Sequence, residues 1–167
     1  MKNAAAKRQI FVICDDVYRQ LIYTDSYHSF AEYRGLRDRI LVVQSFSKPY
    51  AMTGWRMGYL LADKAVKERL ELIHQYTVAS TPSLFQRSAV RALKTSPAAF
   101  VSACRRRRDM VLERLAKIGL PVTKPEGAFY VFPDISAFGL SSADFCRRMI
   151  SEAGLAATPG FCFGDDS

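Results

Sequence analysis

Two short apolar runs, each followed at once by polar residues, constrain the fold of this chain most. Residues 10–14 (Ile-Phe-Val-Ile-Cys) end at Asp15-Asp16, and residues 40–44 (Ile-Leu-Val-Val-Gln) end at Ser45. Runs of this kind are typical of strands that are covered on both faces of a parallel sheet. Residues 58–62 are a weaker third candidate. Because open α/β sheets bind ligands at the carboxyl ends of their strands, we expect a site where these runs end.

Helical periodicity dominates the rest of the chain, so the sequence predicts an α/β fold. The expected helices cover about 63–76, 83–93, 97–117 and 142–153, with further strands at 128–132 and 155–157. Asp63 and Ser141 are suitable N-caps, and Gly119 can end the long third helix. We expect that long helix to connect two domains, residues 1–96 and residues 97–167.

The segment from Ser45 to Tyr59 holds the residues with the most informative chemistry. Lys48 comes just after a strand that we expect to be buried, and low-dielectric surroundings favour the neutral, nucleophilic amine that can form an imine. Ser45 and Ser47 flank it with hydroxyl groups, and Arg56 can bind a phosphate through two hydrogen bonds. Taken alone, these residues indicate an anion site beside a reactive lysine.

The same segment resembles the signature of the class I/II (fold type I) aminotransferases, S-x-S-K followed eight residues later by the arginine of T-G-W-R-x-G. The resemblance implies a pyridoxal-5'-phosphate (PLP) dependent transferase-like fold, with the later part of the large domain and a partial α+β small domain. It also implies that Lys48 carries PLP as a Schiff base. Ser45, Ser47 and Arg56 are then cofactor-binding residues, and Ser45 and Arg56 bind the phosphate.

A second segment, Cys14-Asp15-Asp16-Val17-Tyr18, is similar to the D-E-x-Y sequence at the end of a strand in that family. The resemblance assigns to Asp15 the carboxylate that keeps the pyridine nitrogen protonated, and to Tyr18 the hydroxyl beside the phenolate oxygen of the cofactor. Both residues therefore join Lys48 as expected catalytic residues. Asp16 stands where the family more often has glutamate, and we expect only a supporting contact from it.

Weaker similarity extends the resemblance to about residues 10–164. Residues 125–130 resemble the family's small-domain strand with an aromatic side chain near the substrate, and residues 158–164 resemble the stretch before its substrate-carboxylate arginine. The resemblance implies that the N-terminal half of the fold lies outside these 167 residues. We therefore expect the isolated chain to be inactive.

The implied reaction moves an amino group between an L-amino acid and a 2-oxo acid, in a homodimer. Two alternatives remain open. One is a PLP-dependent β-lyase or cyclopropane-forming synthase of the same fold. The other is a non-catalytic or truncated aminotransferase-like domain, such as a PLP sensor in a DNA-binding regulator.

Composition narrows the other functional classes. The net charge is +8, but the only dense basic run, Arg105–Arg108, accompanies no nucleic-acid motif, so we expect no nucleic-acid partner. No run approaches the roughly 20 apolar residues of a membrane span, and no signal peptide is evident, so the cytoplasm is the expected location. The four cysteines lack CxxC spacing and there are only two histidines, so we expect reduced, packing cysteines and no metal site.

Overall fold

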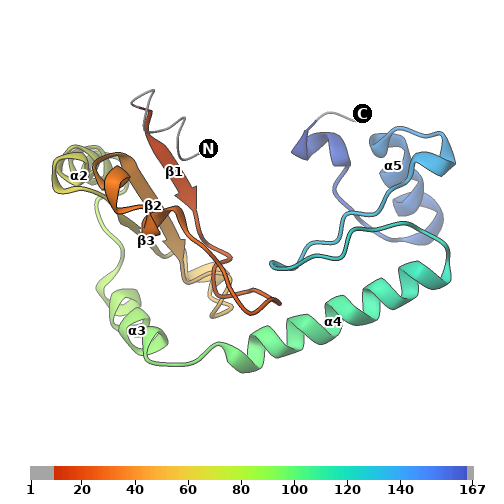
Figure 1. The fold of residues 1–167 in the computed structure, drawn as a ribbon, viewed down its shortest axis with the longest axis horizontal. Coiled ribbons are helices and arrows are strands. Elements are labelled where there is room, and N and C mark those ends of the chain that lie inside the picture. Colours follow the sequence, from red (N-terminus) through yellow and green to blue (C-terminus); the bar gives the residue numbers. More distant parts are fainter. Residues whose placement is uncertain (1–9, 165–167) are drawn as a thin grey trace. The chain divides into compact units, whose positions relative to one another are not determined.

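The computed structural model describes residues 10–164 and contains a three-stranded mixed sheet (Figure 1). Strands β1 (Val12–Asp15), β2 (Ile40–Ser45) and β3 (Gly58–Leu61) lie in the order β1-β2-β3. β1 pairs with β2 in parallel, and β2 pairs with β3 in antiparallel orientation. All three predicted strands are confirmed, although β1 begins at residue 12 instead of residue 10.

The sheet is buried unevenly. Leu36, Ile40, Val42 and Cys14 form one hydrophobic cluster, so the first half of β2 is enclosed as expected. In β1, however, Ile13 is 70% exposed, and every residue of β3 is exposed. Side chains alternate between the two faces of a strand, and only the Cys14 face of β1 is covered here. In the described residues, one face of β1 and both faces of β3 are therefore open to solvent.

Within residues 10–164, four α-helices confirm the helical predictions. They are α2 (Lys64–Val78), α3 (Ser83–Leu93), α4 (Ala98–Lys117) and α5 (Ser142–Ala153). The side chain of Asp63 accepts a hydrogen bond from the backbone of Ala65 (3.0 Å), and Ser141 caps α5 through the backbone of Asp144 (3.1 Å). Short 3-10 helices η1 (Phe30–Glu32) and η2 (Arg34–Arg39) connect β1 to β2.

The two remaining strand predictions, 128–132 and 155–157, are wrong. Ala128 has a left-handed backbone (φ 57°), and the nearby chain makes only isolated bridges, at Gly127 and at Pro133. Residues 155–157 follow α5 as irregular chain. Apolar residues become a strand only where another strand accepts their backbone hydrogen bonds, and the described part of the chain supplies none at either place.

The chain forms two compact units. One consists of Met1–Arg105 with Glu126–Ala128, and the other of Arg106–Pro125 with Phe129–Ser167. Residues 126–128 join the first unit because Tyr23 and Leu21 exchange backbone hydrogen bonds with Glu126 and Ala128 (2.7 and 2.8 Å). The division into domains at residues 96 and 97 stays a prediction.

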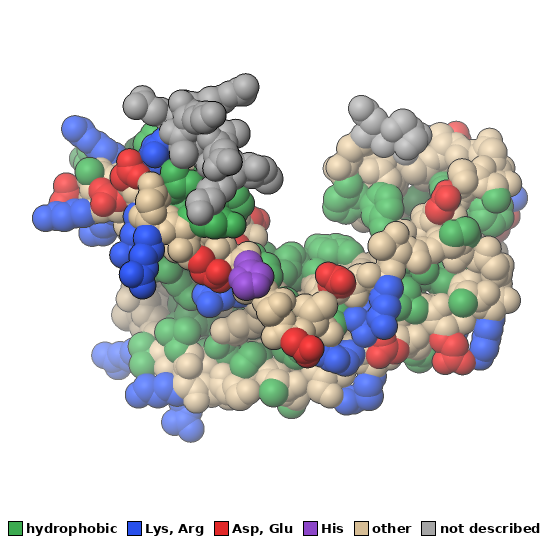
Figure 2. All heavy atoms as spheres, viewed as in Figure 1, with side chains coloured by type: hydrophobic (Ala, Val, Ile, Leu, Met, Phe, Trp, Pro, Cys, Tyr) green, Lys and Arg blue, Asp and Glu red, His purple; other side chains and the backbone are tan. Residues whose placement is uncertain are grey.

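Large apolar side chains are exposed in both units, and Figure 2 shows many of them at the surface. They include Tyr76 on α2 (85% exposed) and Phe163 in the second unit (63%). None of the described helices combines the length and the apolar character that crossing a membrane requires.

Candidate active site

The strand directions bring the predicted site residues to one edge of the sheet. Because β1 and β2 are parallel, Asp15 and Ser45 end their strands at the same edge. β3 runs the other way, so Gly58 begins it opposite Ser45 at that edge. Asp15 is paired with Val43, two residues before Ser45. Strand spacing and rise then place the Cα atoms of Asp15 and Ser45 about 8 Å apart.

The lysine loop, residues 46–57, connects β2 to β3 and carries Lys48 and Arg56. Its two ends are tied together: the backbone N–H of Phe46 donates to the carbonyl of Met57 (3.2 Å). Ser45 contributes from β2, since its hydroxyl donates to the same carbonyl (3.4 Å) and accepts from the backbone N–H of Ser47 (3.0 Å). Phe46 and Met57 are buried with Ala89 of α3. The loop therefore has a fixed base, and both serines belong to it.

Gly58 allows β3 to approach β2 closely at this base. A Cβ atom at this position would lie 2.5 Å from the backbone oxygen of Gln44. Real Cβ atoms essentially never come so close to a backbone oxygen, so a larger residue would push the strands apart.

Lys48 and Tyr18 are brought together although thirty residues separate them in the sequence. The Lys48 ammonium nitrogen lies 5.8 Å from the centroid of the Tyr18 ring, within the range of a cation–π contact. Both residues are half-buried. Tyr18 also packs against the hydrophobic cluster of Leu21, Tyr23 and Cys104.

Arg56 sits in a strained stretch of backbone at the end of the lysine loop. Its φ and ψ are 49° and 48°, and Ala51 in the same loop also has a positive φ of 53°. Such conformations are costly for residues other than glycine and cluster at functional sites. The Arg56 guanidinium is exposed and donates to the carbonyl of Thr53 (2.9 Å). The fork of N–H donors that it carries is suited to binding a phosphate or carboxylate.

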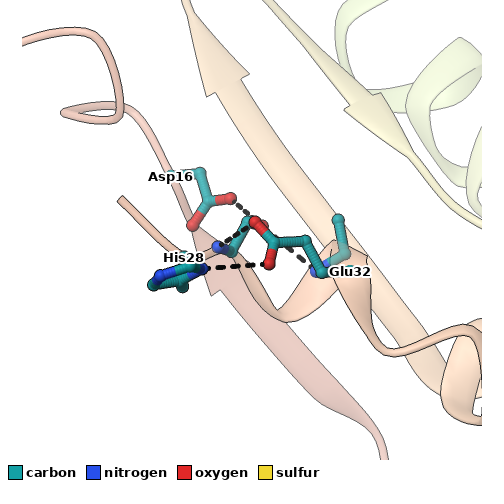
Figure 3. A network of polar contacts seen from close by, with 5 residues as sticks. Asp16, His28 and Glu32 are labelled. Carbon is teal, nitrogen blue, oxygen red and sulfur yellow. Dashed lines mark hydrogen bonds and ion pairs between the residues drawn. The ribbon is translucent and has the colours of Figure 1, made fainter. Parts of the chain in front are cut away.

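The two adjacent aspartates differ sharply in their surroundings. Asp15 is exposed and accepts a long hydrogen bond from the backbone of Val17 (3.4 Å). Asp16 is 5% exposed, and its carboxylate accepts from the hydroxyls of Tyr27 (2.7 Å) and Ser29. The same region contains the contact of His28 with Glu32 (3.2 Å) shown in Figure 3.

The burial of Asp16 and the contact of His28 with Glu32 were not predicted from the sequence. One signal was present: Ser29 and Glu32 have the S-x-x-E spacing of a capping box, and the structure contains that box. The His28 side chain is exposed.

Two further features help to define the site. A cavity of about 700 Å³ lies among β3, α2, α3 and the base of the lysine loop, and none of the predicted site residues lines it. Among the described residues, no group of His, Cys, Asp or Glu is arranged to hold a metal ion. Cys14, Cys104 and Cys146 are buried and reduced, as predicted, and Cys162 is reduced but exposed. The chemistry of the described site therefore rests on the sheet edge and the lysine loop.

Comparison with known proteins agrees with the family resemblance of the sequence. The family model for aminotransferase class I and II matches residues 1–166. Among curated proteins, a probable N-acetyl-LL-diaminopimelate aminotransferase of Bacillus subtilis is 39% identical over 93% of this chain and 40% of its own length. An aspartate aminotransferase of Pyrococcus abyssi is 39% identical over 96% of this chain and 43% of its own length.

Solved structures agree with the family model. The aromatic aminotransferase of Pyrococcus horikoshii superposes with a TM-score of 0.93 at 37% identity, over 99% of this chain and 46% of that one. The aspartate aminotransferase of Thermotoga maritima gives a TM-score of 0.91 at 34% identity, over 98% of this chain and 43% of that one. The predicted fold is thus confirmed, and the chain spans less than half the length of these relatives.

Proposed function

Because this chain belongs to the class I and II aminotransferase family, we propose that it supplies the lysine-bearing part of a PLP-dependent aminotransferase active site. The proposed reaction moves an amino group from an L-amino acid to a 2-oxo acid. The observation that carries this proposal is the gathering of Asp15, Ser45 and the lysine loop at one edge of the sheet, with Lys48 against Tyr18.

The side chains at this edge suit the chemistry of PLP. The edge carries an amine that can bind an aldehyde and a carboxylate that can face a pyridine nitrogen. It also carries an exposed guanidinium and two hydroxyls that can bind a phosphate. Lys48 would hold the cofactor covalently, and Ser45, Ser47 and Arg56 would bind around its phosphate. When bound, PLP supplies an aromatic ring that accepts electrons from the substrate's Cα.

Each residue then has a defined task. With its amine free, Lys48 would remove the proton from the substrate's Cα and later return a proton, so it would act as general base and general acid. Its half-buried position against Tyr18 limits the directions in which the amine can turn. Asp15 would hold a proton on the pyridine nitrogen by its negative charge. The Tyr18 hydroxyl would donate to the oxygen on the cofactor ring.

The test is a product assay on a polypeptide of the relatives' length that contains residues 1–167. With an L-amino acid and 2-oxoglutarate, we expect glutamate to form, and we expect Lys48→Ala to abolish it. Lys64→Ala is the matched control, because the Lys64 side chain is 87% exposed on α2 and lies outside the site. Pyruvate and ammonia in place of glutamate would instead identify a β-lyase. No amino-acid-dependent product at all would favour a non-catalytic domain.

We also propose that the longer polypeptide is a cytoplasmic homodimer, as is implied by the family resemblance. The exposed apolar side chains of α2 and β3 give the described unit surface that another part of an assembly can cover. Light scattering coupled to size-exclusion chromatography tests the dimer. A monomer at micromolar concentration would contradict it.

A further inference from the structure

Asp16 is a buried carboxylate for which the proposed mechanism has no task. It is 5% exposed, directly follows Asp15, and accepts hydrogen bonds on both oxygens. The Tyr27 hydroxyl donates to one oxygen (2.7 Å) and the Ser29 hydroxyl to the other. A carboxylate is costly to bury unless donors compensate it. These two hydroxyls, from a segment eleven to thirteen residues away, provide that compensation.

The donors belong to a segment that is itself well ordered by hydrogen bonds. The Ser29 oxygen accepts from the backbone N–H of Ala31 (3.1 Å), and the Ser29 backbone N–H donates to the Glu32 carboxylate (3.3 Å). That carboxylate also contacts His28, as Figure 3 shows. The Ser29 hydroxyl is therefore already oriented when it donates to Asp16. We call residues 27–32 the clamp segment.

The backbone of Asp16 is fixed as firmly as its side chain. Its N–H donates to the carbonyl of Val43 in β2 (3.0 Å), which extends the β1–β2 pairing by one residue. Its carbonyl accepts from the N–H of Arg19 (2.9 Å), which closes the turn that carries Tyr18. Successive side chains of a strand point to opposite faces. With Asp16 held on the buried face, Asp15 is left exposed on the other.

We infer that Asp16 is a positioning residue, whose bonds to Tyr27 and Ser29 decide which of two adjacent carboxylates faces the site and hold the turn from Asp15 to Tyr18 in place. The inference rests on the proposed function for the roles of Asp15 and Tyr18, and it deepens that function. Burial, followed by the hydrogen bond to Asp16, also raises the pKa of Tyr27 to about 12, in keeping with a persistent contact.

The first test uses the 167-residue chain without cofactor. Backbone hydrogen exchange is compared among Asp16→Ala, Ser29→Ala, Tyr27→Phe and the unsubstituted chain. Asp25→Ala is the matched control, because Asp25 is an exposed aspartate just before the clamp segment. Hydrogen bonds to a charged group are strong enough that losing them should speed exchange at residues 16–19 by about tenfold or more. Asp25→Ala should leave these rates unchanged.

Two results of this test would overturn the inference. One is unchanged exchange at residues 16–19 in all of Asp16→Ala, Ser29→Ala and Tyr27→Phe. The other is an equal acceleration throughout β2 and α3, because Asp16 would then support the stability of the unit and not the position of the turn. The milder variants Ser29→Ala and Tyr27→Phe, which each remove one donor, keep the test decisive if Asp16→Ala does not fold.

A second readout addresses the site itself, in a cofactor-loaded polypeptide that contains the chain. The pH profile of the cofactor's visible absorption depends on the groups that hold its ring. We expect its midpoint to shift in Ser29→Ala and in Asp16→Asn, and Asp16→Glu, which keeps the carboxylate, to restore it. An unshifted midpoint in both variants would overturn the positioning role. If the unsubstituted polypeptide takes up no cofactor, the proposed function fails, and the exchange comparison alone decides whether the clamp exists.

Discussion

Replacing Gly58 with alanine should loosen the base of the lysine loop. The added Cβ would lie 2.5 Å from the backbone oxygen of Gln44 and 3.6 Å from the Cα of Ser45. Both neighbours are backbone atoms of β2, so no flexible side chain can move aside. Ordinary van der Waals contact starts at 3.4 Å, so the added Cβ and the Gln44 oxygen must move apart by about 0.9 Å. That shift would displace Ser45 and the hydrogen bond from Phe46 to Met57.

Overpacking of this kind typically costs about 1–3 kcal/mol. For a domain with a urea m-value of roughly 1–3 kcal/mol per molar, the unfolding midpoint of Gly58→Ala should fall by about 1 M. The assay is urea unfolding followed by circular dichroism. Gly54→Ala is the matched control in the same loop, because no atom lies within 4 Å of its added Cβ. Reduced freedom of the unfolded chain should make that control neutral or more stable by about 0.4–1 kcal/mol. Equal midpoints for the two variants would refute the role given to Gly58.

The remaining predictions concern the site and the clamp. Arg56→Ala should weaken PLP binding to the longer polypeptide about tenfold to a hundredfold in a fluorescence titration, because charge-assisted contacts contribute roughly 1.5–3 kcal/mol each. Asp15→Asn should slow half-reactions in stopped-flow far more than it weakens cofactor binding, since a neutral amide cannot hold the pyridine nitrogen protonated. The hydrogen bond from His28 lowers the pKa of Glu32. The ionised Glu32 carboxylate should therefore stabilise the clamp segment above the ordinary glutamate pKa, and this stabilisation should be lost as pH falls through the lowered value. Tyr27, with its pKa raised to about 12, should stabilise the fold below the ordinary tyrosine pKa and cease to do so as pH rises through 12; exchange rates measured against pH check both. The 167-residue chain alone should show no amino-acid-dependent change of cofactor absorbance. Turnover by the unsubstituted chain, with none by its Lys48→Ala variant, would contradict this.

Local patterns were enough to predict most elements of the fold. The apolar runs before Asp15 and Ser45 became β1 and β2, and the capped periodic segments became α2 to α5. The residues that make up each of these signals lie close together in the sequence, so the signals can be recognised without knowing the fold. A strand also needs a partner, and that is a property of the whole fold. Residues 128–132 look like a strand by composition, but no described strand pairs with them, and Ala128 turns the chain instead.

The candidate site was predictable to a similar extent. Lys48, Ser45 and Arg56 stand out because a spacing motif places them, and the sheet brings them to one edge with Asp15. The sequence did not reveal that Asp16 is buried on the hydroxyls of Tyr27 and Ser29. Nothing local to Asp16 distinguishes it from Asp15, and the donors lie more than ten residues away. Contacts of this kind depend on how a connecting segment folds back over a strand.

The most direct measurement of the central claim is the identity of the lysine that holds the cofactor. The longer polypeptide is incubated with PLP, reduced with borohydride and digested, and its peptides are mapped by mass spectrometry. We expect the phosphopyridoxyl mass on Lys48, its loss in Lys48→Ala and its retention in the Lys64→Ala control. The same mass on another lysine, with Lys48 unmodified, would contradict the role proposed for Lys48.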